Sequence, residues 1–151
     1  MAKESVICYA IPALPHPLLI PVEGVAAVLK NPQLEKMSEA RASWMRGHVT
    51  WNNQRLPVLS YTSLHDSKYD DSKESNLNIV VLNPIPDAVR KAYSGLLCHG
   101  ELQQVGIDDR STFCDRPDNM DKRYIEGVLE QEGTIYIIPK LSALEVAFSY
   151  F

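Results

Sequence analysis

The stretch GHVTWNNQRLPVLSYTSL occupies residues 47–64, and the stretch GVLEQEGTIYIIPKLSAL occupies residues 127–144. Each begins with glycine, continues through a half-apolar strand to a polar pair at residues 52–53 or 132–133, and then follows an apolar strand to a closing leucine. Asparagine and glycine accept the positive φ of a tight hairpin turn. Two equivalent hairpins therefore predict a chain built from two related β lobes, not from a helical bundle.

The composition is that of an ordinary globular protein. The chain has 151 residues, of which 45% are apolar and 23% are charged, and this predicts one compact domain or two very small lobes that share a core. A net charge of −4 without a run of basic residues argues against nucleic acid or an anionic membrane surface as a partner. No signal-like or membrane-spanning segment is visible. We therefore expect a cytoplasmic protein.

Short apolar runs separated by turn residues predict about eight or more strands and little helix. Strands are expected at residues 4–11, 18–20, 78–82, 95–98 and 102–107, in addition to the two hairpins. Residues 22–29 fit either a short helix or a turn followed by a strand. Short helical segments are expected at residues 38–46, 87–93 and 140–151, the last with Pro139 in its first position.

The clearest linker is the polar, turn-rich segment at residues 65–76. It divides the chain, residues 1–151, almost in half, within what we take to be a single domain. An N-terminal lobe is expected at about residues 12–64 and a C-terminal lobe at about residues 77–144, with the first strand completing the core.

The sequence contains no recognisable catalytic constellation. Cys98 and His99 are neighbours on a predicted strand, so their side chains point to opposite faces and cannot form a nucleophile–base pair. The three cysteines lack the spacing of a metal site and fit a reducing compartment. The acidic residues between 108 and 121 lack the alternation of a calcium loop. We therefore predict a binding protein without a cofactor or metal.

With these elements placed, the sequence resembles the CheW-like adaptor domain of bacterial chemosensory arrays, from about residue 5 to residue 144. The matching segments are IPVEGVAAV at 20–28, GHVTWNN at 47–53, LPVL at 56–59, IVVL at 79–82, GLL at 95–97 and the final Gly-Val hairpin at 127–128. The resemblance implies an all-β fold of two small five-stranded β barrels packed on each other, with short helical turns and a C-terminal helix. This agrees with the two hairpins.

The sequence departs from the family pattern at four positions. Asn52 stands where the family usually has arginine, and Asn53 replaces the glycine that follows it. Ser60 stands at a usual aspartate and Ala27 at a usual glutamate. Without the arginine the hairpin lacks a planar fork for carboxylates, so the usual receptor contact is not implied. This short form looks most similar to the ChpC-type adaptors of type IV pilus chemosensory pathways.

The resemblance implies a non-catalytic adaptor that joins chemoreceptors to a CheA-type histidine kinase, with other CheW-like adaptors as further possible partners, in control of twitching motility. The residues expected to contact partners are Val22, Val25, Ala27, Val28, Trp51, Asn52, Asn53 and Tyr61. The valines and the hairpin tip would form a first surface, and Trp51 and Tyr61 would reach a groove between the lobes. Core packing is the alternative for the valines and for Trp51. A small-ligand or lipid-binding β barrel and an enzyme remain alternative functions.

Overall fold

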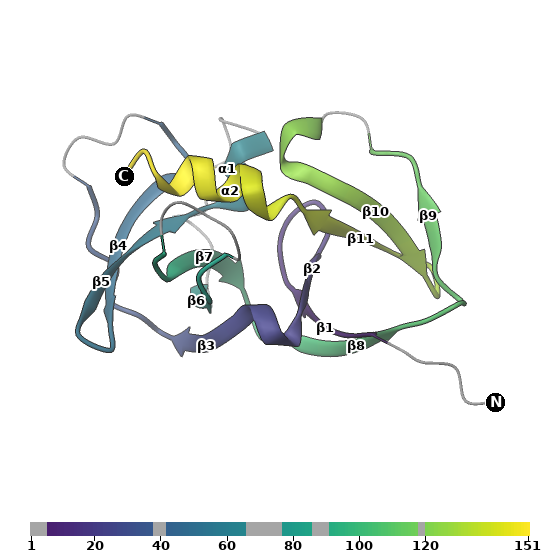
Figure 1. The fold of residues 1–151 in the computed structure, drawn as a ribbon, viewed down its shortest axis with the longest axis horizontal. Coiled ribbons are helices and arrows are strands. Elements are labelled where there is room, and N and C mark those ends of the chain that lie inside the picture. The colour runs from purple at the N-terminus through teal and green to yellow at the C-terminus, as the bar shows by residue number, and fades with distance from the viewer. Residues whose placement is uncertain (1–5, 38–41, 66–76, 86–90, 118–119) are drawn as a thin grey trace.

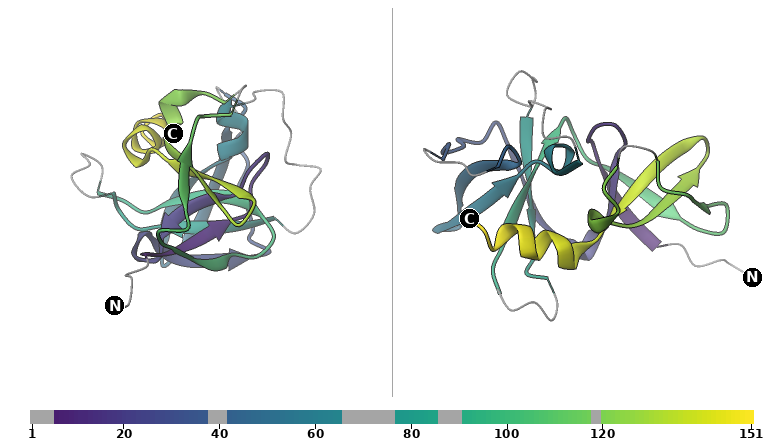
Figure 2. Two further views of the ribbon diagram at one scale, coloured as in Figure 1. Left: turned by 90° about the vertical axis from the view of Figure 1, so that its right-hand side faces the viewer. Right: turned by 90° about the horizontal axis from the view of Figure 1, so that it is seen from above.

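Two β-sheets lie side by side in the computed structural model, and the C-terminal helix crosses over their junction (Figure 1). The structure describes residues 6–37, 42–65, 77–85, 91–117 and 120–151. Seen from above, the helix starts at one sheet and extends across the side of the other (Figure 2). The predicted all-β class is therefore confirmed.

The first sheet has six strands in the order β8-β1-β2-β11-β10-β9. These strands are β1 (Val6–Ile11), β2 (Leu18–Pro21), β8 (Gln103–Ile107), β9 (Thr112–Cys114), β10 (Ile125–Gln131) and β11 (Thr134–Pro139). We call this sheet, with the loops that join its strands, the six-strand lobe.

The second sheet has five strands in the order β3-β6-β7-β5-β4. These strands are β3 (Val25–Lys30), β4 (Met45–Trp51), β5 (Gln54–Leu59), β6 (Leu77–Leu82) and β7 (Ser94–His99). We call this sheet the five-strand lobe. Two α-helices and two 3₁₀ turns are described: η1 (Val22–Gly24), α1 (Tyr61–His65), η3 (Lys122–Tyr124) and α2 (Leu141–Phe148).

The two predicted hairpins are present and share their irregularities. Asn52 and Asn53 have φ values of 52° and 60°, and Glu132 and Gly133 have φ values of 52° and 81°, so both turns have two successive residues with positive φ. One register shift lies just before Gly47 in β4 and one just before Gly127 in β10. Each second strand also pairs in parallel with a distant strand, β5 with β7 and β11 with β2.

Apolar residues form three clusters, one inside each lobe and one between the lobes. The cluster of the five-strand lobe is built on Val49, Val58, Ile79 and Val81, whereas that of the six-strand lobe contains only three buried residues, Cys8, Leu19 and Leu129. The largest cluster joins β1, β2, β6, β7 and β11 to α1 and α2, and its members include Ile11, Leu96, Ile137 and Phe148. The junction between the lobes is therefore the main hydrophobic core of the molecule.

The predicted division into lobes is wrong, because the lobes are interleaved in sequence. Strands β6 and β7 follow the predicted linker but belong to the five-strand sheet with β3, β4 and β5. The chain instead changes sheets after β2 and again after β7. Residues 66–76 lie outside the described part of the chain. The sheets are also not closed into barrels, since β8 and β9 pair on one side only among the described strands.

Several predicted local elements differ from those observed. Residues 22–29 form the turn-plus-strand alternative, η1 followed by β3. Met45 and Arg46, which were expected in a helix, begin β4, whereas residues 38–41 lie outside the described part. The same holds for residues 86–90 of the expected helical turn, and residues 91–93 are not helical. Pro139 ends β11, so α2 begins only at Leu141.

Candidate partner-binding surfaces

The predicted first surface lies on β3, an edge strand of the five-strand sheet. Val25 and Ala27 are half-buried and pack against the inter-lobe cluster and the five-strand cluster respectively, whereas Val28 points outward with 37% of its surface exposed. Val22 precedes them in η1 and is half-buried. Val28 is therefore the valine of this strand that is exposed to solvent, whereas Val25 packs against the core between the lobes.

The tip of the β4–β5 hairpin forms a second exposed feature. Asn52 and Asn53 are exposed at the turn, while Trp51 is half-buried against the five-strand core and meets the Tyr93 ring edge-on at 5.0 Å between centroids. Ala27 and Trp51 pack against the same cluster. The β3 edge and the hairpin tip therefore come from opposite edges of one curved sheet but share its core.

Tyr61 does not reach an open groove, because its side chain is buried between the lobes with 2% exposure. Its hydroxyl donates a hydrogen bond of 2.5 Å to the carbonyl oxygen of Tyr124, which links α1 of the five-strand lobe to η3 of the six-strand lobe. Burial raises the pKa of this hydroxyl, and the nearby Asp121 carboxylate raises it further. A partner could touch Tyr61 only if the lobes separated.

His65 makes the second polar link at the same junction. Its Nδ1 accepts a hydrogen bond of 3.0 Å from the backbone N–H of Asp121, and its ring lies between those of Tyr61 and Tyr124. The buried Nε2 has no hydrogen-bond partner among the described residues. Burial lowers the pKa of His65 to about 4 despite the nearby carboxylate of Asp121, whose own pKa the Arg123 guanidinium lowers to about 2. His65 is therefore neutral at pH 7.

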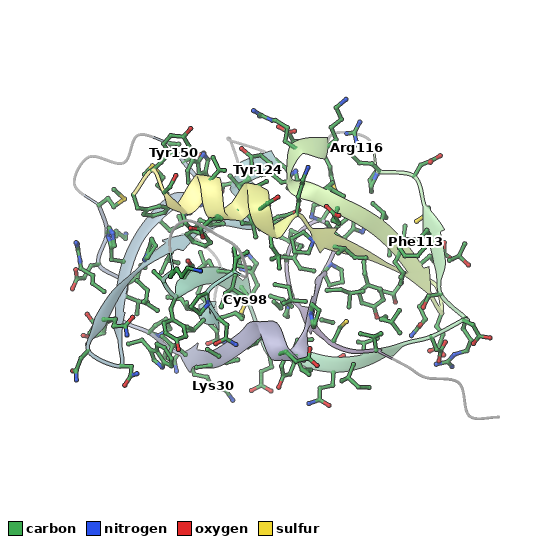
Figure 3. All side chains as sticks on the ribbon, viewed as in Figure 1. Lys30, Cys98, Phe113, Arg116, Tyr124 and Tyr150 are labelled. Carbon is green, nitrogen blue, oxygen red and sulfur yellow. The ribbon has the colours of Figure 1, made fainter. Side chains whose placement is uncertain are left out.

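The end of the chain packs against the five-strand lobe, and this contact was not predicted from the sequence. Phe148, near the end of α2, is buried at the junction, and Phe151 packs edge-on against Trp44 at 5.9 Å and against His48 at 5.7 Å between ring centroids. Leu144, Phe148 and Phe151 recur at helical spacing, and this periodicity could have indicated a buried face. Tyr150, by contrast, is exposed beside the helix end (Figure 3).

A groove of about 380 Å³ lies where β2 and β11 end and α2 begins. Leu19, Ile20, Ile138 and Leu141 contribute apolar lining, and Glu126 and Lys140 add charges. Pro21 also lines the groove and directly precedes Val22 of η1. The groove is therefore continuous along the chain with the β3 surface.

A metal cluster and an activated thiol at Cys98 are both missing from the described part of the chain. No group of three or more histidine, cysteine, aspartate or glutamate side chains in this part of the chain could hold a metal ion. Cys98 is fully buried at the centre of the molecule (Figure 3), and burial raises its pKa to about 11, so that its thiol is protonated and weakly nucleophilic at pH 7. Among the helices described here, none is long and apolar enough to span a membrane.

The comparisons with known proteins agree with this geometry. The crystal structure of the scaffolding protein TtCheW from Thermoanaerobacter tengcongensis superposes with a TM-score of 0.73 at 15% sequence identity, covering 93% of this chain and 87% of that one. At this identity the likeness establishes the fold alone. No curated protein matches the sequence. The CheW-like domain matches residues 15–147, which is most of the chain, and the protein therefore belongs to the CheW-like domain family.

Proposed function

We propose that this protein is a non-catalytic adaptor that couples chemoreceptors to a CheA-type histidine kinase in the cytoplasm. Membership of the CheW-like family supports this role, and the observation that carries it is the exposed β3 edge, continued by η1 into the apolar groove at the start of α2. A groove with an apolar lining is the kind of surface at which proteins dock, and Pro21 of its lining directly precedes η1 and β3 in the chain.

Two separate docking surfaces would allow one adaptor to hold two partners at once. The β3 surface and the groove form the first surface in this proposal. The hairpin tip with Asn52, Asn53 and Trp51 forms the second, and Tyr61 has no part in it because it is buried. A stable contact at each would bury about 800 Å² per partner. Position 52 holds asparagine in place of the arginine that is usual in the family, which favours a specialised adaptor. We therefore place the protein in a ChpC-type pathway that controls twitching motility.

The test is a binding measurement with the receptor tip and the CheA-type kinase of the source cell, on wild type and on Val28→Asp. At this partly exposed strand position aspartate should cost about 1 kcal/mol of stability, which leaves the protein folded. A charge placed in an apolar contact should weaken binding to one partner at least about tenfold. Phe113→Asp is the matched control, because Phe113 is an exposed apolar residue on an edge strand of the other lobe (Figure 3).

Loss of one partner in Val28→Asp, with Phe113→Asp retaining it, would support the proposed surface. Unchanged binding of both partners to Val28→Asp would remove β3 from the interface. If wild-type protein bound neither partner, the adaptor role itself would fail.

A further inference from the structure

A second cleft, of about 540 Å³, lies where the loop between β1 and β2 meets the end of β7, the start of β8 and β11. The loop residues and Ala10 give it an apolar wall, and Leu14 leaves 46% of its surface exposed there. The polar lining includes Gln103, Thr134 and Tyr136. The volume falls within the range of about 300–1,000 Å³ that is usual for small-molecule sites. The cleft shares no lining residue with the groove beside α2.

The apolar wall is held in place from both lobes. Thr62 of α1 accepts a hydrogen bond from the Leu14 N–H at 3.3 Å and donates one to the Leu14 carbonyl oxygen at 2.7 Å. The N–H of His99 in β7 donates to the Pro12 carbonyl at 3.3 Å, and the N–H of Ile137 in β11 donates to the Pro17 carbonyl at 2.9 Å. Prolines also restrict the backbone of this loop. The cleft is therefore preformed, and little of the binding free energy would be lost in ordering this loop.

The charge of the lining residues determines which charge a ligand of this cleft should carry. Glu101 contributes a carboxylate, and no lysine or arginine lines the cleft among the described residues. Glu101 pairs with Lys30 at 3.0 Å, but the two side chains are 76% and 66% exposed, so this ion pair contributes little and can be exchanged. Tyr136, Thr134 and Gln103 offer oxygen atoms that can accept further hydrogen bonds.

We propose that this cleft binds a small amphipathic organic ammonium ion, with its apolar body against the proline-containing loop and its protonated amine on Glu101. A charge-assisted hydrogen bond to the carboxylate would give the ammonium its preference over neutral or anionic relatives. The site joins residues of both lobes, because His99 belongs to β7 and Tyr136 to β11. Binding is therefore expected to stabilise the junction between the lobes. This site is independent of the adaptor role.

The experiment is a titration of the ¹⁵N-labelled chain with benzylamine, benzyl alcohol and benzoate, followed through the backbone amide shifts. The three probes share one ring and differ in the charge of the head group. Benzylamine should bind in the millimolar range that is usual for fragments, shifting the amides of Gln103 and Thr134. It should bind about two to five times more tightly than benzyl alcohol, as an exposed ion pair allows, and benzoate should bind most weakly.

Three variants make the test specific. Glu101→Gln should remove the preference for benzylamine, whereas Glu132→Gln, which changes the same charge outside this cleft, should retain it. Thr134→Trp, at an exposed first position of β11, should fill the cleft and abolish the shifts from all three probes. The proposal is overturned if benzoate binds as tightly as benzylamine, if the preference survives in Glu101→Gln, or if roughly 20 mM benzylamine shifts no amide of the cleft.

Discussion

Two glycines at equivalent places in the two hairpins should respond in opposite ways to the same substitution. Gly47 has a φ of +137°, and a Cβ atom built on it would lie 2.1 Å from the Glu35 carbonyl oxygen. Gly127 lies at the equivalent bulge of β10, but its Cβ would meet only the Ile138 Cδ1 atom at 3.7 Å and the Phe113 ring at 3.8 Å. The first position has no room for a side chain, and the second makes ordinary van der Waals contact.

The cost of Gly47→Ala can be built from these contacts. A non-glycine residue held at such a φ costs about 1–3 kcal/mol. The new methyl group must also displace Glu35, which exchanges two backbone hydrogen bonds with His48 at 2.8 and 2.9 Å, each contributing about 0.5–1.5 kcal/mol. The expected loss is therefore about 2–6 kcal/mol of unfolding free energy. Gly127→Ala should be neutral or should stabilise by about 0.4–1 kcal/mol, because alanine restricts the unfolded chain.

Urea unfolding of wild type, Gly47→Ala and Gly127→Ala, followed through the fluorescence of Trp44 and Trp51, measures the difference directly. The free energies of the two variants should differ by at least about 2 kcal/mol. Equal losses in both variants would show that the bulge as such, and not the close approach of Glu35, sets the requirement for glycine. A neutral Gly47→Ala would refute the geometry of the Glu35–His48 bridge.

Two further predictions concern the junction between the lobes. The pKa of His65 is lowered to about 4 in the folded protein, whereas in the unfolded chain it is about 6.5. As the pH falls below about 6.5, the unfolded chain therefore takes up the proton before the folded protein does, and stability should decrease between pH 6.5 and 4. The expected loss is about 2 kcal/mol after allowance for partial exposure. Urea unfolding at pH 7 and pH 4.5 should show this loss in wild type and a smaller one in His65→Asn. The asparagine side-chain oxygen can still accept a hydrogen bond from the Asp121 N–H. Equal losses in the two proteins would exclude His65 as the cause. Tyr61→Phe should cost about 0.5–1.5 kcal/mol at pH 7, because the Tyr124 carbonyl loses this donor but keeps the hydrogen bond from the Lys140 N–H. A change below about 0.5 kcal/mol would show that water replaces the hydroxyl.

Local sequence signals predicted the hairpins well, because the information lies within the hairpins themselves. Asparagine and glycine at positions 52, 53 and 133 tolerate positive φ, and alternating apolar residues set the inward faces of the flanking strands. Strand β9 was missed for the opposite reason. Its three residues, Thr112, Phe113 and Cys114, are all exposed, so no alternation of burial marked them in the sequence.

The pairing of distant strands could not be predicted from the sequence in the same way. Apolar runs such as residues 79–82 indicate burial, but they do not say which sheet a strand joins. The return of β6 and β7 to the five-strand sheet depends on non-local partners, such as the parallel pairing of Val58 with Gly95. Tyr61 was expected to reach a groove between the lobes. Tyr61 instead begins the short helix α1, which no pattern predicted, and its side chain is buried at the junction between the lobes.

The interleaved sheets bear on how an adaptor could act. The chain passes between the lobes after β2 and after β7, and α2 leaves the six-strand lobe to pack Phe148 and Phe151 over the five-strand lobe. Separation of the lobes would expose the largest apolar cluster and break the Tyr61 and His65 links together. A hinge motion between the lobes would therefore cost much of the folding free energy, so partners on the two lobes would be held at a fixed separation and angle. An adaptor of this kind would transmit a signal by fixing the relative positions of its partners, not by changing its own shape. Among the described residues, we find no way for the lobes to separate without exposing this core.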